Sequence, residues 1–178
     1  MTIKTAIREQ IRHQANFACE FCGVTETDTG GQLTIDHFQP ISQQGDDKIE
    51  NLLYCCIRCN QYKLDYWPQH SDDPVLWHPR QESYSKHFLE LEDGTLHPLT
   101  TMAAFTIKRL RLNRFPLIAH RLRKQQHTQE IRLLTRYKET IELLDKMHNQ
   151  QSELMEEQKQ LLREDKKWLS FLLKNKVI

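Results

Sequence analysis

Two pairs of cysteines constrain this chain more than any other feature of its sequence. Cys19 and Cys22 form one Cys-x-x-Cys sequence, and Cys56 and Cys59 form a second. Each two-residue spacer lets one tight turn present both sulfurs to the same ion, and four thiolates complete the tetrahedral shell of Zn²⁺ at about 2.3 Å per bond. A single pair would also fit a redox motif. Two pairs predict a structural zinc site that closes the segment between them.

The fifth cysteine, Cys55, leaves one choice open. An odd number of cysteines in a chain without a signal peptide argues against a disulfide framework. Pairing Cys55 with Cys59 would give a three-residue spacer, which zinc also accepts. The match to the spacing of the first pair favours Cys56 as the third ligand. Cys55 is then expected to be a small buried apolar side chain.

Charge and hydropathy exclude several classes of protein. The chain has 178 residues, with 25 basic and 24 acidic side chains and a net charge of +1, so any nucleic-acid affinity must come from local clustering. No apolar run approaches the ~18 residues of a membrane span. The first residues, 1–14, include basic side chains but no apolar run after them, unlike a secretory signal. We expect a soluble cytoplasmic protein with no membrane partner.

Hydrophobic periodicity predicts the elements of the N-terminal part. Apolar side chains at helical spacing predict a short helix over residues 1–16. Alternation predicts a strand over 32–38, and a short apolar run predicts its partner strand over 51–55, with a loop over 39–47 between them. A further helix is predicted to begin near Asn60.

The C-terminal part is predicted to be mainly helical. Residues 68–100 are rich in Pro and are expected to form a packed connector with a short hairpin near residues 92–94. Helical sequence begins at Thr100 and is expected to break at Pro116. Residues 117–178 contain no Pro and no Gly, which predicts a long helix or a helical hairpin.

Apolar side chains repeat every seven residues along this last segment. One row comprises Leu134, Ile141, Met155, Leu162 and Leu169, with His148 in one turn, and a second comprises Met147, Leu154, Leu161 and Trp168. A neighbouring row of Gln151, Gln158 and Asp165 argues against a regular two-stranded coiled coil. The stripe fits a helix that packs on its own domain. It equally fits a homodimer or a surface for a partner protein.

The order of motifs in the N-terminal third resembles a known family. In chain order they are Cys19-x-x-Cys22, Asp36-His37, Pro40, Gly45, Asn51-Leu52, Cys56-x-x-Cys59-Asn60 and Lys63. Over about residues 17–65 this order resembles the zinc-braced HNH nucleases. Trp77-His-Pro-Arg80 and Leu110-Arg-Leu-Asn-Arg114 are similar, more weakly, to segments that follow the core in some bacterial members.

The resemblance implies an α+β fold with two parts. We expect a small ββα-metal nuclease core, braced by the four-cysteine zinc site, within an HNH domain over residues 1–100. That domain would include the N-terminal helix and the irregular connector. Residues 101–178 are expected to form a helical region, a basic helix followed by a long amphipathic one.

The motif residues suit phosphodiester hydrolysis, which needs an activated water and a cation at the phosphate. His37, with an ordinary pKa of about 6.5, is the side chain best suited to take a proton from water. Asp36 and Asn60 offer hard oxygen ligands, which favour Mg²⁺ or Mn²⁺. Neighbours on an ideal strand point to opposite faces, so Asp36 and His37 share a site only at a strand end or bend.

The resemblance assigns a role to each of these residues. It makes His37 the general base and gives the catalytic cation to Asp36 and Asn60. Asn51 is expected to pin the loop between the strands through hydrogen bonds to backbone. Lys63, one helical turn after Asn60, is expected to contact the scissile or an adjacent phosphate, with a plain surface lysine as the alternative. Because Asn60 takes the third motif position instead of His, a hard catalytic cation is expected there.

A basic segment between residues 107 and 124 is the predicted nucleic-acid contact. It carries seven basic side chains and no acidic one, an asymmetry that suits the phosphate backbone. Helical spacing would place Arg111, Arg114 and Arg121 roughly on one side, and Lys108 completes the predicted set. A solvated helix face is the alternative.

Together these features predict a metal-dependent HNH endonuclease that acts on DNA, with RNA not excluded. Phage defence, restriction or a mobile element are the expected settings. One alternative is a non-catalytic zinc-dependent module that binds nucleic acid. Another is a nuclease effector subunit that docks on a partner protein through its C-terminal helix.

Overall fold

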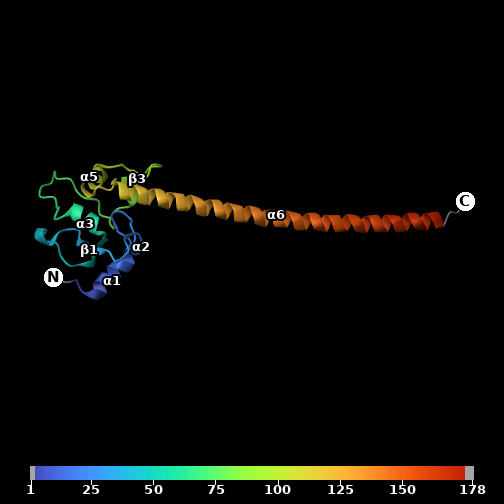
Figure 1. Ribbon diagram of the computed structural model, residues 1–178, viewed down its shortest axis with the longest axis horizontal. Coiled ribbons are helices and arrows are strands. Elements are labelled where there is room, and N and C mark those ends of the chain that lie inside the picture. Colours follow the sequence, from blue (N-terminus) through green and yellow to red (C-terminus); the bar gives the residue numbers. More distant parts are fainter. Residues whose placement is uncertain (1–2, 175–178) are drawn as a thin grey trace. The chain divides into compact units, whose positions relative to one another are not determined.

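The computed structural model describes residues 3–174, and Figure 1 follows the order of the elements along the chain. The chain divides into two compact units, Met1–Gln125 and Gln126–Ile178. The sequence-based division into 1–100 and 101–178 remains a prediction.

The centre of the first unit is a ββα arrangement. Strands β1 (Thr34–His37) and β2 (Leu52–Cys55) pair antiparallel, and His37, the last residue of β1, lies opposite Leu52, the first of β2. Helix α3 (Ile57–Lys63) follows directly and packs on β1. The two predicted strands and the predicted ββα core are confirmed.

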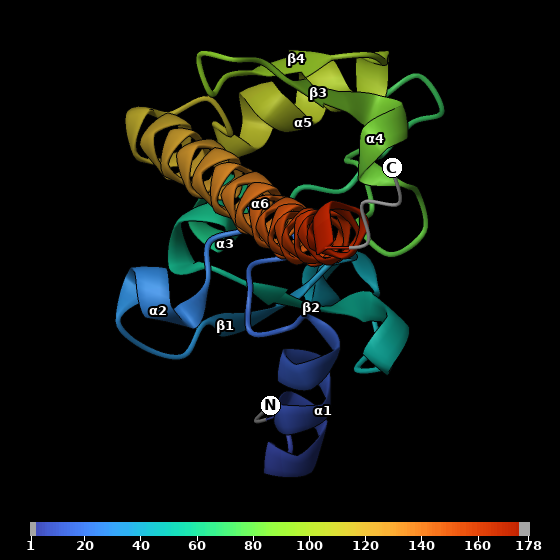
Figure 2. The same cartoon turned by 90° about the vertical axis from the view of Figure 1, so that its right-hand side faces the viewer.

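Two further features position this core. Helix α1 (Thr5–Gln14) is amphipathic, as its spacing predicts, and buries Ile11 against the core. Figure 2 shows α1 and α3 on opposite sides of the two strands. The remaining short elements are the helix α2 (Glu26–Thr29) and the 3₁₀ turns η1 (Ile41–Gln43) and η2 (Ile49–Asn51).

Helix α3 begins three residues earlier than the predicted start near Asn60. The thiol of Cys56 caps it, since its Sγ accepts a hydrogen bond from the backbone N–H of Cys59 at 3.4 Å. The second cysteine pair therefore forms the first turn of the helix. The helix ends after Lys63, because Leu64 has a positive φ of 53° that an α-helix does not accommodate.

The connector folds into a small hairpin and then into helix. Its elements are α4 (Tyr84–His87), β3 (Phe88–Glu90), β4 (Leu96–Pro98) and α5 (Thr101–Leu110). The hairpin predicted near residues 92–94 is confirmed. Its turn needs Gly94, which has a φ of +76° and lies so close to Ile118 that an added Cβ would meet that carbonyl oxygen at 2.8 Å.

The expected break in the helical segment falls before Pro116. Helix α5 ends at Leu110, and Arg111 follows in the left-handed region with a φ of 49°. Helix α6 (Phe115–Lys174) then starts with Pro116 in its first turn. Proline suits that position because the missing N–H would have no partner inside the helix.

The second unit consists of the continuation of α6 as a single helix, so the helical hairpin is not formed. Every side chain described in residues 126–174 is exposed. The apolar rows are included, and Leu134 and Trp168 are 67% and 64% exposed. Among the described residues, no helix is both long and apolar enough to cross a membrane.

A buried ion pair ties the connector to the ββα core. Arg80 donates two hydrogen bonds to the Glu20 carboxylate, at 2.6 and 2.9 Å, and two more to the carbonyl oxygens of Ile49 and Leu52, both at 2.8 Å. Glu20 also accepts the N–H of Tyr54 at 2.6 Å. The Arg80 guanidinium thus joins the first cysteine turn, η2 and β2.

Replacing Arg80 with alanine is expected to lower the free energy of unfolding by about 3–5 kcal/mol, because it leaves a buried carboxylate without its partner. Urea unfolding of the purified protein measures this loss. The exposed Lys86, replaced by alanine, is the matched control and should change stability by no more than about 0.5 kcal/mol. Equal stability of the two variants would contradict the structural role of Arg80.

Candidate functional site

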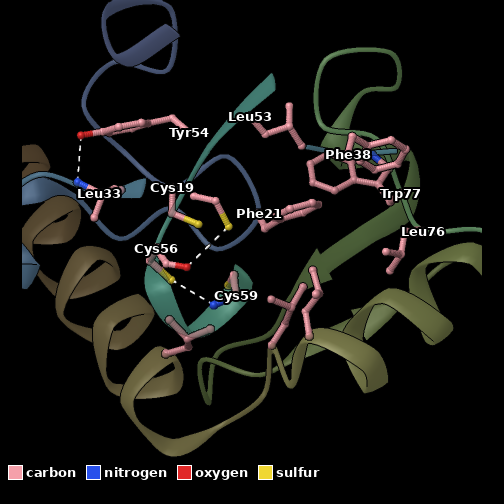
Figure 3. Close-up of a cluster of buried hydrophobic side chains, with 14 of the residues drawn as sticks. Cys19, Phe21, Leu33, Phe38, Leu53, Tyr54, Cys56, Cys59, Leu76 and Trp77 are labelled. Carbon is pink, nitrogen blue, oxygen red and sulfur yellow. Dashed lines mark hydrogen bonds between the residues drawn. The ribbon is translucent and has the colours of Figure 1, made fainter. Parts of the chain in front are cut away.

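The four predicted zinc ligands converge in the first unit. The sulfurs of Cys19, Cys22, Cys56 and Cys59 all lie within 4.8 Å of one another. Figure 3 shows Cys19, Cys56 and Cys59 within one group of buried side chains. The Sγ atoms of Cys22 and Cys56 are 3.7 Å apart, and tetrahedral bonds of about 2.3 Å would separate neighbouring sulfurs by roughly 3.8 Å. The cluster is therefore compatible with zinc.

The structure also decides between Cys55 and Cys56. Cys55 is completely buried at the end of β2, and its Sγ donates to the carbonyl oxygen of Cys56 at 3.5 Å. It is not one of the four converging cysteines. The cluster geometry therefore favours the predicted choice of Cys56, and Cys55 packs as a small buried side chain.

Arg114 faces this cysteine cluster. Its guanidinium lies 3.7 Å from the Sγ of Cys59 and 4.0 Å from that of Cys56. Burial opposes its charge, but the neighbouring thiolates raise the pKa of Arg114 overall. A Zn²⁺ ion with four thiolates has a net charge of −2, which this guanidinium offsets. The structure thus gives the Arg114 charge a partner inside the protein, and the predicted nucleic-acid contact at Arg114 stays a prediction.

A separate cleft holds the remaining motif residues. Its volume is about 500 Å³, and it is lined by Asp36, His37, Pro40, Ile41, Ser42, Asn60, Gln61, Lys63, Leu64 and Asp65. Asp36 and His37 are the last two residues of β1, the strand end that a shared site requires. Asn60 enters from α3. The sequence missed Asp65, which follows α3 without a recognisable motif.

Asp36 has an oxygen suited to a cation. The residue is only 9% exposed. Lys63 Nζ lies 3.2 Å from its Oδ2 but outside hydrogen-bond geometry, so this buried oxygen accepts no hydrogen bond within the described part of the chain. Burial raises the pKa of Asp36, although Lys63 and His37 oppose that shift. A buried carboxylate oxygen without a donor fits a hard divalent cation.

Lys63 does not reach toward solvent, as a phosphate contact would. It is completely buried, and its Nζ donates to the carbonyl oxygen of His37 at 2.7 Å. From helix α5, Arg109 donates to the carbonyl oxygen of Lys63 at 2.9 Å and stacks on Tyr66. This corrects the predicted phosphate contact. Lys63 is a positioning residue that holds the end of β1 against α3.

The imidazole of His37 is held by a residue that the sequence did not indicate. Its Nε2 lies 2.7 Å from Oδ1 of Asp47. Among the described residues, its Nδ1 has no hydrogen-bond partner, so this nitrogen can accept a proton from water. Asp47 belongs to the loop between the strands, and only its position ten residues after His37, in an acidic loop, could have suggested the contact.

Asn51 pins that loop by three hydrogen bonds to backbone. Its Oδ1 accepts the N–H of Gln39 at 2.7 Å, and its Nδ2 donates to the carbonyl oxygens of Gln39 at 3.0 Å and Asp46 at 2.8 Å. These are the backbone bonds that the sequence predicts for Asn51. They fix both ends of the loop that carries Asp47.

The other basic residues of the predicted contact separate in space. Arg121 is 5% exposed and donates to the carbonyl oxygens of Gly94 at 2.5 Å and Leu112 at 2.9 Å, which corrects its assignment as a nucleic-acid contact. Arg111 and Lys108 are exposed. The single-helix alignment of the predicted set is wrong, because α5 ends before Arg111.

The resemblance to zinc-braced HNH nucleases implies a ββα unit, a four-cysteine cluster and an Asp-His pair at the strand end. The structure has all three features. Residues 19–65 match the model of the family described as HNH endonuclease. The resemblance is thus confirmed for this range, which contains both the cysteine cluster and the cleft. No curated protein and no solved structure gave a match.

Proposed function

We propose that this chain is a metal-dependent endonuclease that hydrolyses phosphodiester bonds in DNA at the cleft of Asp36, His37 and Asn60. The family match supports nuclease activity. The observation that carries the finer proposal is the buried Oδ2 of Asp36, which has no hydrogen-bond donor among the described residues although it lies beside a histidine in an open cleft.

In this proposal His37 is the general base. Asp47 holds its Nε2, so Nδ1 takes a proton from the water that attacks the phosphorus. The bond from phosphorus to the leaving oxygen then breaks, and that oxygen is protonated. Lys63 holds the backbone carbonyl of His37 in place, and Asn51 holds the backbone of Gln39, two residues further along the chain.

Asp36 and Asn60 would hold the catalytic cation, Mg²⁺ or Mn²⁺. When bound, such an ion neutralises charge on the phosphate and on the leaving oxygen. The four-cysteine site would hold a structural Zn²⁺ and takes no part in the reaction. A cytoplasmic role in phage defence, restriction or a mobile element is part of the proposal and rests on the resemblance alone.

The cleft favours this function over a zinc module that only binds nucleic acid. Binding alone requires neither a histidine held by a carboxylate nor, beside it in an open cleft, an Asp36 Oδ2 left without a hydrogen bond from any described residue. A role as effector subunit, docked through α6, is compatible with the same chemistry.

The test is incubation of supercoiled plasmid with the purified zinc-loaded protein. With Mg²⁺ or Mn²⁺ we expect nicked or linear DNA, and with EDTA we expect intact plasmid. Single-stranded RNA of defined length serves as the parallel substrate. If folded, zinc-loaded protein cuts neither nucleic acid with either cation, the chain is a binding module and the proposal fails.

A further inference from the structure

A second depression in the first unit also borders α3 and has no role in the proposed chemistry. Its volume is about 950 Å³. We name it the basic groove; the lining residues that matter here are Asp28, Arg58, Gln61, Tyr62, His120 and Arg123.

Positive charge dominates the basic groove. Asp28 supplies the only carboxylate among its lining residues in the described part of the chain. That carboxylate accepts the N–H of Thr25 at 2.7 Å and lies 3.6 Å from Nδ1 of His120, so it already has partners within the protein. The guanidinium groups of Arg58 and Arg123 are exposed, and they leave the groove with a surplus of positive charge.

Arg111 adds a cation next to the groove, besides the lining residues Arg58, Arg114 and Arg123. Its guanidinium lies 4.8 Å from the ring centroid of Tyr62, a groove residue on α3. Stacking on the Tyr62 ring holds the planar guanidinium group in one orientation while its N–H groups stay exposed. Arginine recognises phosphate through such oriented N–H groups. The left-handed backbone of Arg111 places it there, outside the helix that its sequence spacing suggested.

The basic groove meets the cleft at one residue. Gln61 lines both of them, and Asn60 beside it lines the cleft. A helix with its side chains is about 10–12 Å across, and duplex DNA carries one charge per ~1.7 Å of axis. A nucleic acid with one phosphate in the cleft therefore extends over α3 far enough to place others in the groove.

We propose that the basic groove binds the phosphate backbone of the nucleic acid beside the cleavage position, through Arg58, Arg111 and Arg123. This inference rests on the proposed nuclease function. It takes Arg111 from the predicted set and adds Arg58 and Arg123 from the lining of the groove. The chemistry recognised is a run of phosphodiesters, and duplex DNA, single-stranded DNA and RNA are its three possible sources.

The test is binding of labelled oligonucleotides of each kind, without divalent cations, over a range of salt concentrations. In the variant Arg58→Gln, Arg111→Gln, Arg123→Gln, the slope of log affinity against log salt should fall by ~0.7–0.9 for each phosphate interaction removed. The matched control Arg132→Gln, Arg136→Gln, Lys138→Gln removes three exposed charges from α6 and should keep the wild-type slope. The nucleic acid for which the slope falls in the groove variant, but not in the control, is the one that the groove binds.

Two further measurements separate the possible failures. In the variant Arg58→Gln, Arg111→Gln, Arg123→Gln, the zinc content and the melting temperature should match those of the wild-type protein. Its plasmid cleavage at saturating DNA should keep the wild-type kcat, while its KM rises. If both triple variants bind all three nucleic acids with the wild-type slope, the inference about the groove is overturned even where cleavage is intact. Absence of cleavage with a reduced slope would overturn the proposed function and leave the groove supported.

Discussion

Replacing Cys22 with serine is expected to abolish zinc binding and to unfold the ββα core. Structural zinc contributes an apparent ~10–16 kcal/mol in small zinc units, whereas whole domains are stable by only about 5–15 kcal/mol. The strands here are four residues each, and a sheet of two short strands is marginal without further support. Closure of Cys19, Cys22, Cys56 and Cys59 around one zinc ion would supply that support.

Elemental analysis should find about one zinc per wild-type chain and none in the variant, and circular dichroism should show the loss of folded structure. Cys55→Ser is the matched control, since Cys55 lies in the same strand end but outside the cluster, and it should retain zinc. Wild-type protein that is folded without zinc would contradict the assignment. Loss of zinc in Cys55→Ser would move the third ligand to that residue.

The four-cysteine cluster and the strand pair could be predicted from the sequence because their signals are local. A two-residue spacer fixes the geometry of each cysteine turn by itself, and the short apolar run at Leu52 marks a buried strand without tertiary information. The start of α3 could not be predicted, because its cap is a cysteine thiol and not one of the usual capping side chains.

For the basic residues, the sequence could not distinguish exposed side chains from those with partners inside the protein. Arg121 bonds to carbonyl oxygens 9 and 27 residues away in the chain, and Arg114 faces sulfurs 55 and 58 residues away. Backbone carbonyls carry no sequence signal, so these arginines were indistinguishable from exposed ones. Lys63 was misplaced for the same reason, since its main acceptor is the carbonyl oxygen of His37.

The candidate site likewise contains residues that the sequence could place and residues that it could not. Asp36, His37 and Asn60 could be placed together because a family resemblance orders them along the chain. Asp47 and the basic groove could not, because they depend on how the interstrand loop and the segment after α5 return to the core. Residues outside the matched range 19–65, Arg109 among them, hold parts of the site in position.

Replacing His37 with alanine is expected to reduce the rate of DNA cleavage ~10²–10⁴-fold, the usual contribution of a general base. The imidazole lies at the end of β1, where Asp47 holds one nitrogen and the other has no protein partner among the described residues. The side-chain Nζ of Lys63 donates to the backbone carbonyl oxygen of residue 37, a bond that does not involve the imidazole. The fold should therefore survive the substitution.

The measurement is single-turnover cleavage of plasmid with Mg²⁺ or Mn²⁺, together with oligonucleotide affinity, zinc content and melting temperature. Only the rate should change. His70→Ala is the matched control, because it removes an exposed imidazole from the connector, away from the cleft. If His37→Ala cuts as fast as this control, another group takes the proton from water. The cleft would then need a different base, although the zinc-braced fold around it would stand.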